Sequence, residues 1–182
     1  MGITGFFTAF GKEKFDQLGR GLMQKIVSWD PEAATEDEIQ EMLKELDKIT
    51  SEAGKAMADY RKEQAEADAI QKNYDRYLAA AELLNKQVED SSVAGNTAKS
   101  NELSSSLGKL VQDLESMKPE VERELHEANE AKTYYEEVRE LAEVTASKVK
   151  SALSQLEAAK RRMRQAEIDK QRQENKAQRA EY

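Results

Sequence analysis

A heptad repeat of apolar residues runs through most of the chain and constrains its fold more than any other feature. Two series of positions, each spaced by seven residues, begin at Ile39 and Met42, and fourteen of the fifteen are apolar or aromatic. The series are Ile39, Leu46, Ala53, Tyr60, Ala67, Tyr74, Ala81, Val88 and Met42, Ile49, Ala56, Glu63, Ile70, Tyr77, Leu84. A repeat of 3.5 residues predicts a left-handed coiled coil.

A second heptad repeat follows a short polar segment. Ser, Gly and Asn cluster at residues 91–97, which predicts a turn at Gly95 and Asn96. From residue 103 to residue 166, seventeen of nineteen repeat positions are again apolar or aromatic. The series are Leu103, Leu110, Met117, Glu124, Ala131, Val138, Thr145, Ala152, Ala159, Ala166 and Leu107, Leu114, Val121, Ala128, Tyr135, Ala142, Val149, Leu156, Met163. Two long helices joined by one turn predict an antiparallel hairpin.

The expected fold is therefore all-α, with an N-terminal helix in residues 1–29 and a coiled-coil hairpin in residues 30–182. Within the hairpin we expect a first arm at 35–90, a turn at 91–97, a second arm at 98–166 and a basic polar tail at 167–182 that frays or is disordered.

Local signals mark the boundaries of the hairpin. Pro31 follows Asp30 at the first boundary, and Thr35 with Glu38 three residues later matches a capping box. Pro119 falls inside the second arm and predicts a kink or a short break near residues 117–118. This kink is either a tolerated surface feature or a functional hinge, and the sequence leaves both open.

Composition excludes several classes of function. The chain has no cysteine, which rules out disulfides and thiol catalysis, and no apolar run approaches the ~18 residues of a membrane span. The single histidine, His126, occupies no repeat position, and its neighbours Glu124 and Glu127 are expected to be ordinary helix-surface residues, so it has no converging partners in the sequence. We therefore expect no catalytic residues, no metal site and no cofactor.

Residues 1–29 differ from the rest of the chain. All four phenylalanines and five of the eight glycines lie in the first 22 residues. On a helix, the apolar side chains cover about half of the circumference, with Val27 inside this face and Phe15 at its edge. The candidate membrane-binding residues are Ile3, Phe6, Phe7, Phe10, Lys12, Lys14, Phe15, Leu18, Arg20, Leu22, Lys25 and Trp29. Because glycine disfavours helix in water, we expect folding on membrane insertion; the alternative is packing against the second arm.

The second arm is longer than the first. Folding the chain at Gly95 places Ile39 near position 151, so the later repeat positions need cover from residues 1–29 or from another subunit. The second option would make the hairpin a polymer building block, with candidate assembly residues Leu156, Ala159, Lys160, Arg161, Arg162, Met163 and Arg164.

Charge is unevenly distributed along the chain. Residues 1–29 and 160–182 are each net basic, so the segment between them is more negative than the net charge of -8 of the whole chain. The basic cluster at 160–164 is expected to be a solvated helix end or to contact the acidic middle of another subunit. Nucleic acid is not an expected partner, because no aromatic residues interleave the cluster.

Several short motifs add to this organisation. Met1-Gly2-Ile3 opens the amphipathic segment, Asp30-Pro31-Glu32 follows it, and Ile39-Gln40-Glu41-Met42 begins the alanine-rich hairpin. In this order and spacing the chain resembles the PspA/Vipp1 (IM30) family, bacterial members of the ESCRT-III superfamily. Two departures are the more polar stretch at residues 33–38 and the end near the basic tail, since family members usually continue into further short helices. Either the chain is a short member or those helices lie outside this sequence.

The resemblance implies a cytoplasmic, non-enzymatic protein, peripheral on the inner face of the cell membrane. Such a protein polymerises into rods or rings and remodels or stabilises the bacterial inner membrane under stress. Its implied partners are further copies of the chain, anionic lipids and an AAA+ or stress-regulatory protein. The alternative is a soluble coiled-coil adaptor or regulator that binds a partner such as an AAA+ protein through the hairpin. A pore-forming protein is a weaker third option, against which the missing long apolar hairpin counts.

Overall fold

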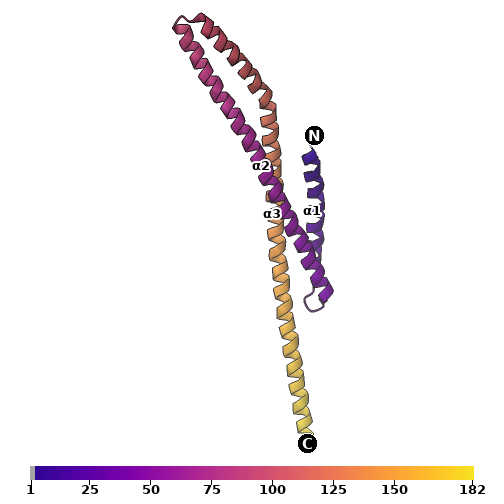
Figure 1. Ribbon diagram of the computed structural model, residues 1–182. Coiled ribbons are helices and arrows are strands. Elements are labelled where there is room, and N and C mark those ends of the chain that lie inside the picture. The colour runs from indigo at the N-terminus through magenta and orange to yellow at the C-terminus, as the bar shows by residue number, and fades with distance from the viewer. Residues whose placement is uncertain (1–2) are drawn as a thin grey trace. The chain divides into compact units, whose positions relative to one another are not determined.

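The computed structural model is all-helical in the residues it describes (Figure 1), as the heptad repeats predict. It describes the backbone of residues 3–182 and the side chains of residues 13–182. In this part of the chain, α1 spans Ile3–Val27, α2 spans Glu36–Val93 and α3 spans Thr97–Ala180. The helices contain 25, 58 and 84 residues, so α2 and α3 are far longer than ordinary globular helices.

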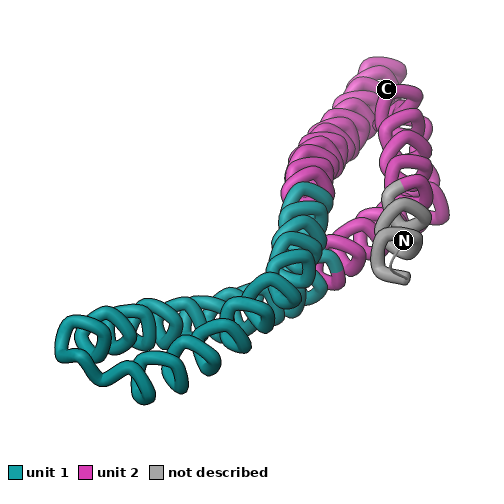
Figure 2. Tube along the Cα trace, turned by 90° about the horizontal axis from the view of Figure 1, so that it is seen from above, with its two compact units in different colours: residues 1–6, 56–135 teal, residues 7–55, 136–182 magenta. Residues whose placement is uncertain are grey.

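The helices form two compact units (Figure 2). The hairpin unit, to which the division also assigns residues 1–6, consists mainly of residues 56–135, the second part of α2 and the first part of α3. The three-helix unit contains residues 7–55 and 136–182, which are most of α1, the first part of α2 and the second part of α3. The hairpin unit thus has two helices, and the other unit has a third.

The heptad positions form the buried seams of both units. Of the repeat positions, all of which the structure describes, only Tyr77, Met163 and Ala166 are exposed. In the hairpin unit the rings of Tyr60 and Tyr135 stack across the seam, with centroids 5.8 Å apart and an interplanar angle of 8°. This burial pattern is the one that a coiled-coil repeat produces.

The start of α2 has the capping box that the sequence predicts. The Glu38 backbone N–H donates to the Thr35 hydroxyl at 3.3 Å, and the Thr35 N–H donates to the Glu38 carboxylate at 3.0 Å. Each side chain thereby satisfies a backbone donor that the first helical turn leaves free. The cap fixes where α2 begins.

The turn between α2 and α3 is shorter than the expected 91–97 segment and comprises residues 94–96. Gly95 has a φ of 78°, and the Asn96 N–H donates to the Ser91 carbonyl at 3.0 Å, as in a Schellman motif. Asn96 also begins α3, because its side-chain oxygen accepts the Lys99 N–H at 3.2 Å. One residue therefore closes α2 and caps α3, which explains why the turn is so short.

Helix α3 continues through both places where the sequence suggests an interruption. Pro119 lies inside α3 without a break, and Figure 1 shows α3 curving in its first half, the half that contains Pro119. The expected disordered tail is helical to Ala180, although every residue from Lys160 onward is exposed. Strong helix formers and pairs such as Gln165 with Asp169, four residues apart, support it without burial.

Candidate functional site

Helix α1 packs inside the three-helix unit. Phe15 and Leu22 are 2% and 0% exposed, and Leu18 and Trp29 are half-buried. Lys14 and Arg20 are exposed. The side chains of Ile3, Phe6, Phe7, Phe10 and Lys12 lie outside the described residues.

The buried face of α1 is rotated from the expected one. Phe15, expected at the edge, is buried, whereas Val27, expected within the face, is 82% exposed. The buried positions 15, 19 and 22 follow helical spacing and define a different stripe from the one that apolar residues alone predict. Residues 3–27 are helical in this packed arrangement, which is the alternative to membrane insertion that the sequence leaves open.

One of these glycines allows close contact between α1 and α3. A Cβ atom built on Gly19 would lie 2.6 Å from Leu141 Cδ2, whereas one built on Gly21 would meet nothing within 4 Å. Gly19 is therefore at the α1–α3 interface, and Gly21 is not. A larger side chain at position 19 would have to displace Leu141 or α1 itself.

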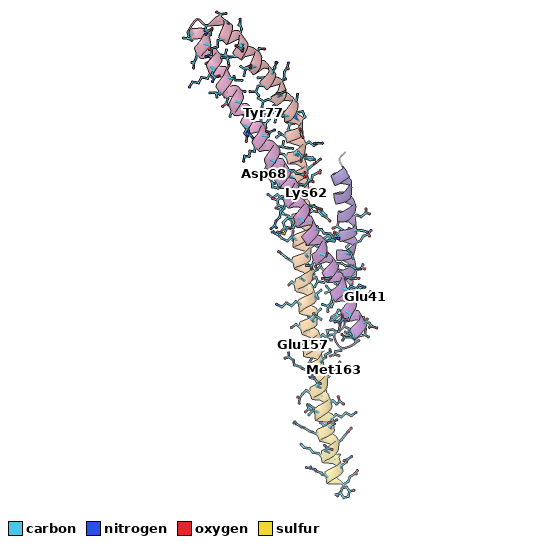
Figure 3. All side chains as sticks on the ribbon, viewed as in Figure 1. Glu41, Lys62, Asp68, Tyr77, Glu157 and Met163 are labelled. Carbon is cyan, nitrogen blue, oxygen red and sulfur yellow. The ribbon has the colours of Figure 1, made fainter. Side chains whose placement is uncertain are left out.

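Two ion pairs join α1 to α2. Lys25 Nζ donates to Glu45 Oε1 at 2.8 Å and lies 3.1 Å from Glu41 Oε1. The hydrogen bond to Glu45 is the main reason why the pKa of Lys25 is raised. Figure 3 labels Glu41 near the connection between α1 and α2. The pair with Glu41 is exposed and contributes little, whereas the pair with Glu45 is part-buried.

A groove remains between α1 and α2. Its volume is about 860 Å³, and it is lined by Phe15 and Leu18 of α1 and by polar side chains of α2 that include Lys48 and Ser51. The α2 side of the groove opposite Leu18 is polar, and Leu18 remains partly exposed. The other helices of the chain therefore bury only part of the apolar face of α1.

The candidate assembly residues separate into two groups. Leu156 and Ala159 are 6% and 0% exposed within the single chain, so no second subunit is needed to cover them. Met163 is 45% exposed and is labelled in Figure 3 on the part of α3 beyond the α1–α2 connection. The basic residues Lys160, Arg161, Arg162 and Arg164 are all exposed. Among the candidate assembly residues, the exposed ones therefore begin at residue 160.

A buried acidic cluster lies in the seam of the hairpin unit. Glu63 of α2 and Glu124 of α3 are 8% and 9% exposed, and the Oε2 atom of each has no hydrogen-bond partner among the described residues. One carboxylate oxygen from each of these residues and one from Glu127 all lie within 4.8 Å of one another. The other oxygen of Glu124 lies 3.5 Å from Arg123 Nη2.

Burial raises the pKa of both Glu63 and Glu124. The negative charges of Glu66 and Glu127 raise both pKa values further, whereas Lys62 and Arg123 partly oppose the shifts. The nearby basic side chains therefore do not fully compensate the negative charge of the ionised carboxylates at this layer of the seam.

The sequence does not predict this cluster: Glu124 and Glu127, beside His126, are expected to be ordinary helix-surface residues, and for Glu124 this expectation is wrong, because it is buried. Glu63 and Glu124 are the acidic exceptions in the two heptad series. Folding the chain at Gly95 would have placed position 63 opposite position 127, one turn from residue 124. The signal was therefore present in the pairing of the arms. His126, by contrast, is exposed and pairs with Glu130 at 3.1 Å on its own helix.

Comparison of the chain with protein-family models, with curated proteins and with solved structures returned no match. None of the helices in residues 3–182 has both the length and the apolar character needed to cross a membrane.

Proposed function

We propose that the protein is a self-assembling peripheral membrane protein of the ESCRT-III-like type, similar to the PspA/Vipp1 family. In this proposal α1 exchanges between a docked state on the three-helix unit and a state bound to anionic lipid. The hairpin and the exposed end of α3 supply the polymer contacts. The observation that carries the proposal is the incompletely covered apolar face of α1, which two ion pairs of Lys25 join to α2.

The energetic balance between the two states supports this exchange. Undocking α1 exposes Phe15 and Leu22, at a cost of about 1.5–3 kcal/mol each, and a membrane would bury both again. The Lys25 pairs would be lost, at about 0.2–1 kcal/mol each. Attraction of basic side chains to an anionic surface returns about 1 kcal/mol each. Because these quantities are similar, lipid composition can decide which state is occupied.

The proposed exchange is tested by changing α2 and leaving α1 intact. The double variant Glu41→Gln with Glu45→Gln removes the negative charge of both partners of Lys25, so α1 should undock more readily. We expect an increase of up to about fivefold in affinity for phosphatidylglycerol vesicles, measured by co-sedimentation.

The matched control is Glu82→Gln with Glu89→Gln, which changes the net charge equally at exposed positions of α2 in the hairpin unit. Equal gains in the two double variants would mean that net charge alone explains the binding. Absence of binding by the unaltered chain would contradict the membrane proposal. Electron microscopy of the pure protein tests assembly separately, and small monodisperse particles at all salt and pH values would contradict it.

A soluble coiled-coil adaptor is the second candidate function. It is favoured by the full burial of Phe15 and Leu22, which needs no membrane, and by exposed apolar side chains near the turn. Leu83 and Val93 are 58% and 90% exposed there. In that function the hairpin turn region would bind a protein partner, and the vesicle experiment would show no binding.

A further inference from the structure

The acidic cluster is unusual because it lies at a layer of the seam where a coiled-coil repeat normally has apolar side chains. Glu63 and Glu124 both hold repeat positions and both are more than nine-tenths buried. Each directs one oxygen without a hydrogen-bond partner into the seam, within the described part of the chain. A buried, unpaired carboxylate is costly, so two at one layer require a compensating positive charge.

The surrounding side chains do not supply enough positive charge. The charged side chains that face the cluster from the two helices are Lys62 and Glu66 of α2 and Glu120, Arg123 and Glu127 of α3. The guanidinium of Arg123 approaches Glu124 Oε1 from an exposed position and leaves Oε2 without a partner. The acidic side chains therefore outnumber the basic ones at this layer.

We propose that Glu63, Glu124 and Glu127 bind a hard divalent cation, Ca²⁺ or Mg²⁺, between α2 and α3. Three carboxylates with no nitrogen or sulfur donor are the ligands that such cations prefer. Oxygens on opposite sides of a Ca²⁺ ion lie about 5 Å apart, which matches a group whose ligand atoms all lie within 4.8 Å. Water completes the coordination, and the bound ion links the two arms of the hairpin unit.

The test uses the full chain after treatment with a chelator. Ca²⁺ and Mg²⁺ are each titrated at constant ionic strength, with isothermal titration calorimetry for binding and circular dichroism for thermal unfolding. We expect one saturable site per chain and a rise of about 5 °C in the unfolding midpoint at a hundredfold excess over Kd. The ion that binds more tightly identifies the cation.

Variants separate the cluster from general charge screening. Glu63→Gln with Glu124→Gln should abolish both the binding and the shift in the unfolding midpoint. The control, Glu102→Gln with Glu122→Gln, makes the same charge change at exposed positions of α3 and should keep both. Should the first double variant fail to fold, Glu127→Gln alone removes a less buried ligand and should weaken binding at least about tenfold.

Three results would overturn the proposal. The first is no saturable binding by the unaltered chain, and the second is equal binding by the cluster and control variants. The third is stabilisation of the unaltered chain by acid with no effect of either ion at neutral pH, because a shared proton would then compensate the carboxylates.

Discussion

The two units use the same repeat and bury it to different degrees. In the three-helix unit, Met42, Ile49, Val138 and Val149 are 0–1% exposed, whereas hairpin-unit positions such as Leu110 are only half-buried. Two helices leave the sides of their seam open to water, and a third helix closes one side. The difference shows that α1 is what turns an open seam into a closed core.

The largest expected effect comes from removing a side chain that α1 contributes to that core. Leu22→Ala should lower the stability of the three-helix unit by about 3 kcal/mol, because Leu22 is fully buried. Leu110→Ala in the hairpin unit should cost about 1 kcal/mol, since its side chain is already partly hydrated. Native-state hydrogen exchange measures each unit separately, and equal losses would mean that α1 does not close the core.

A smaller effect is expected from forcing α1 away from α3. Gly19→Leu should destabilise the docked helix by about 1–3 kcal/mol through overlap with Leu141, and increase proteolytic cleavage within α1. Gly21→Leu adds the same side chain where nothing lies within 4 Å, so its cleavage rate should not rise. Similar cleavage of the two variants would show that residue 19 is not at a tight interface.

The smallest effect concerns the pH dependence of the hairpin unit in the presence of a chelator. The folded state raises the pKa of Glu63 and Glu124, so it binds protons more tightly than the unfolded state does. The contribution of these two carboxyl groups to stability should therefore be fully present below the ordinary glutamate pKa and should be lost as the pH rises through the raised values.

This pH effect is measured as the gap in unfolding midpoint between the unaltered chain and Glu63→Gln with Glu124→Gln. The variant should be the more stable at neutral pH, and the gap should narrow as the pH falls toward about 5. A gap that does not change with pH would show that these two carboxylates are compensated in the fold.

Much of the fold could be predicted from periodicity, because the coiled-coil repeat is local in sequence. The series beginning at Ile39 and Leu103 predicted the seams, and the spacing of Thr35 and Glu38 predicted the start of α2. The composition of residues 91–93 predicts a turn, but these residues are the last of α2, because the Gly95 cap needs only three residues.

The candidate sites were harder to predict, because they depend on which surfaces meet. The buried face of α1 is selected by its partners, so Phe15 could not be distinguished from its neighbours by apolarity alone. Glu63 and Glu124 are visible as separate exceptions, but their burial together depends on the pairing of two distant segments. Local sequence patterns predict the helices, whereas the candidate sites depend on which distant segments pack together.

The three-residue turn has a mechanical consequence for the hairpin unit. Seams built from alanine and tyrosine repeat every seven residues, so α2 could slide along α3 by one repeat and find similar neighbours. The turn at residues 94–96 holds no spare length, because Asn96 ends one helix and starts the next. Sliding would therefore require unwinding about two turns of helix near the turn, at the cost of their hydrogen bonds. The cap at Gly95 and Asn96 therefore keeps α2 and α3 in a single register.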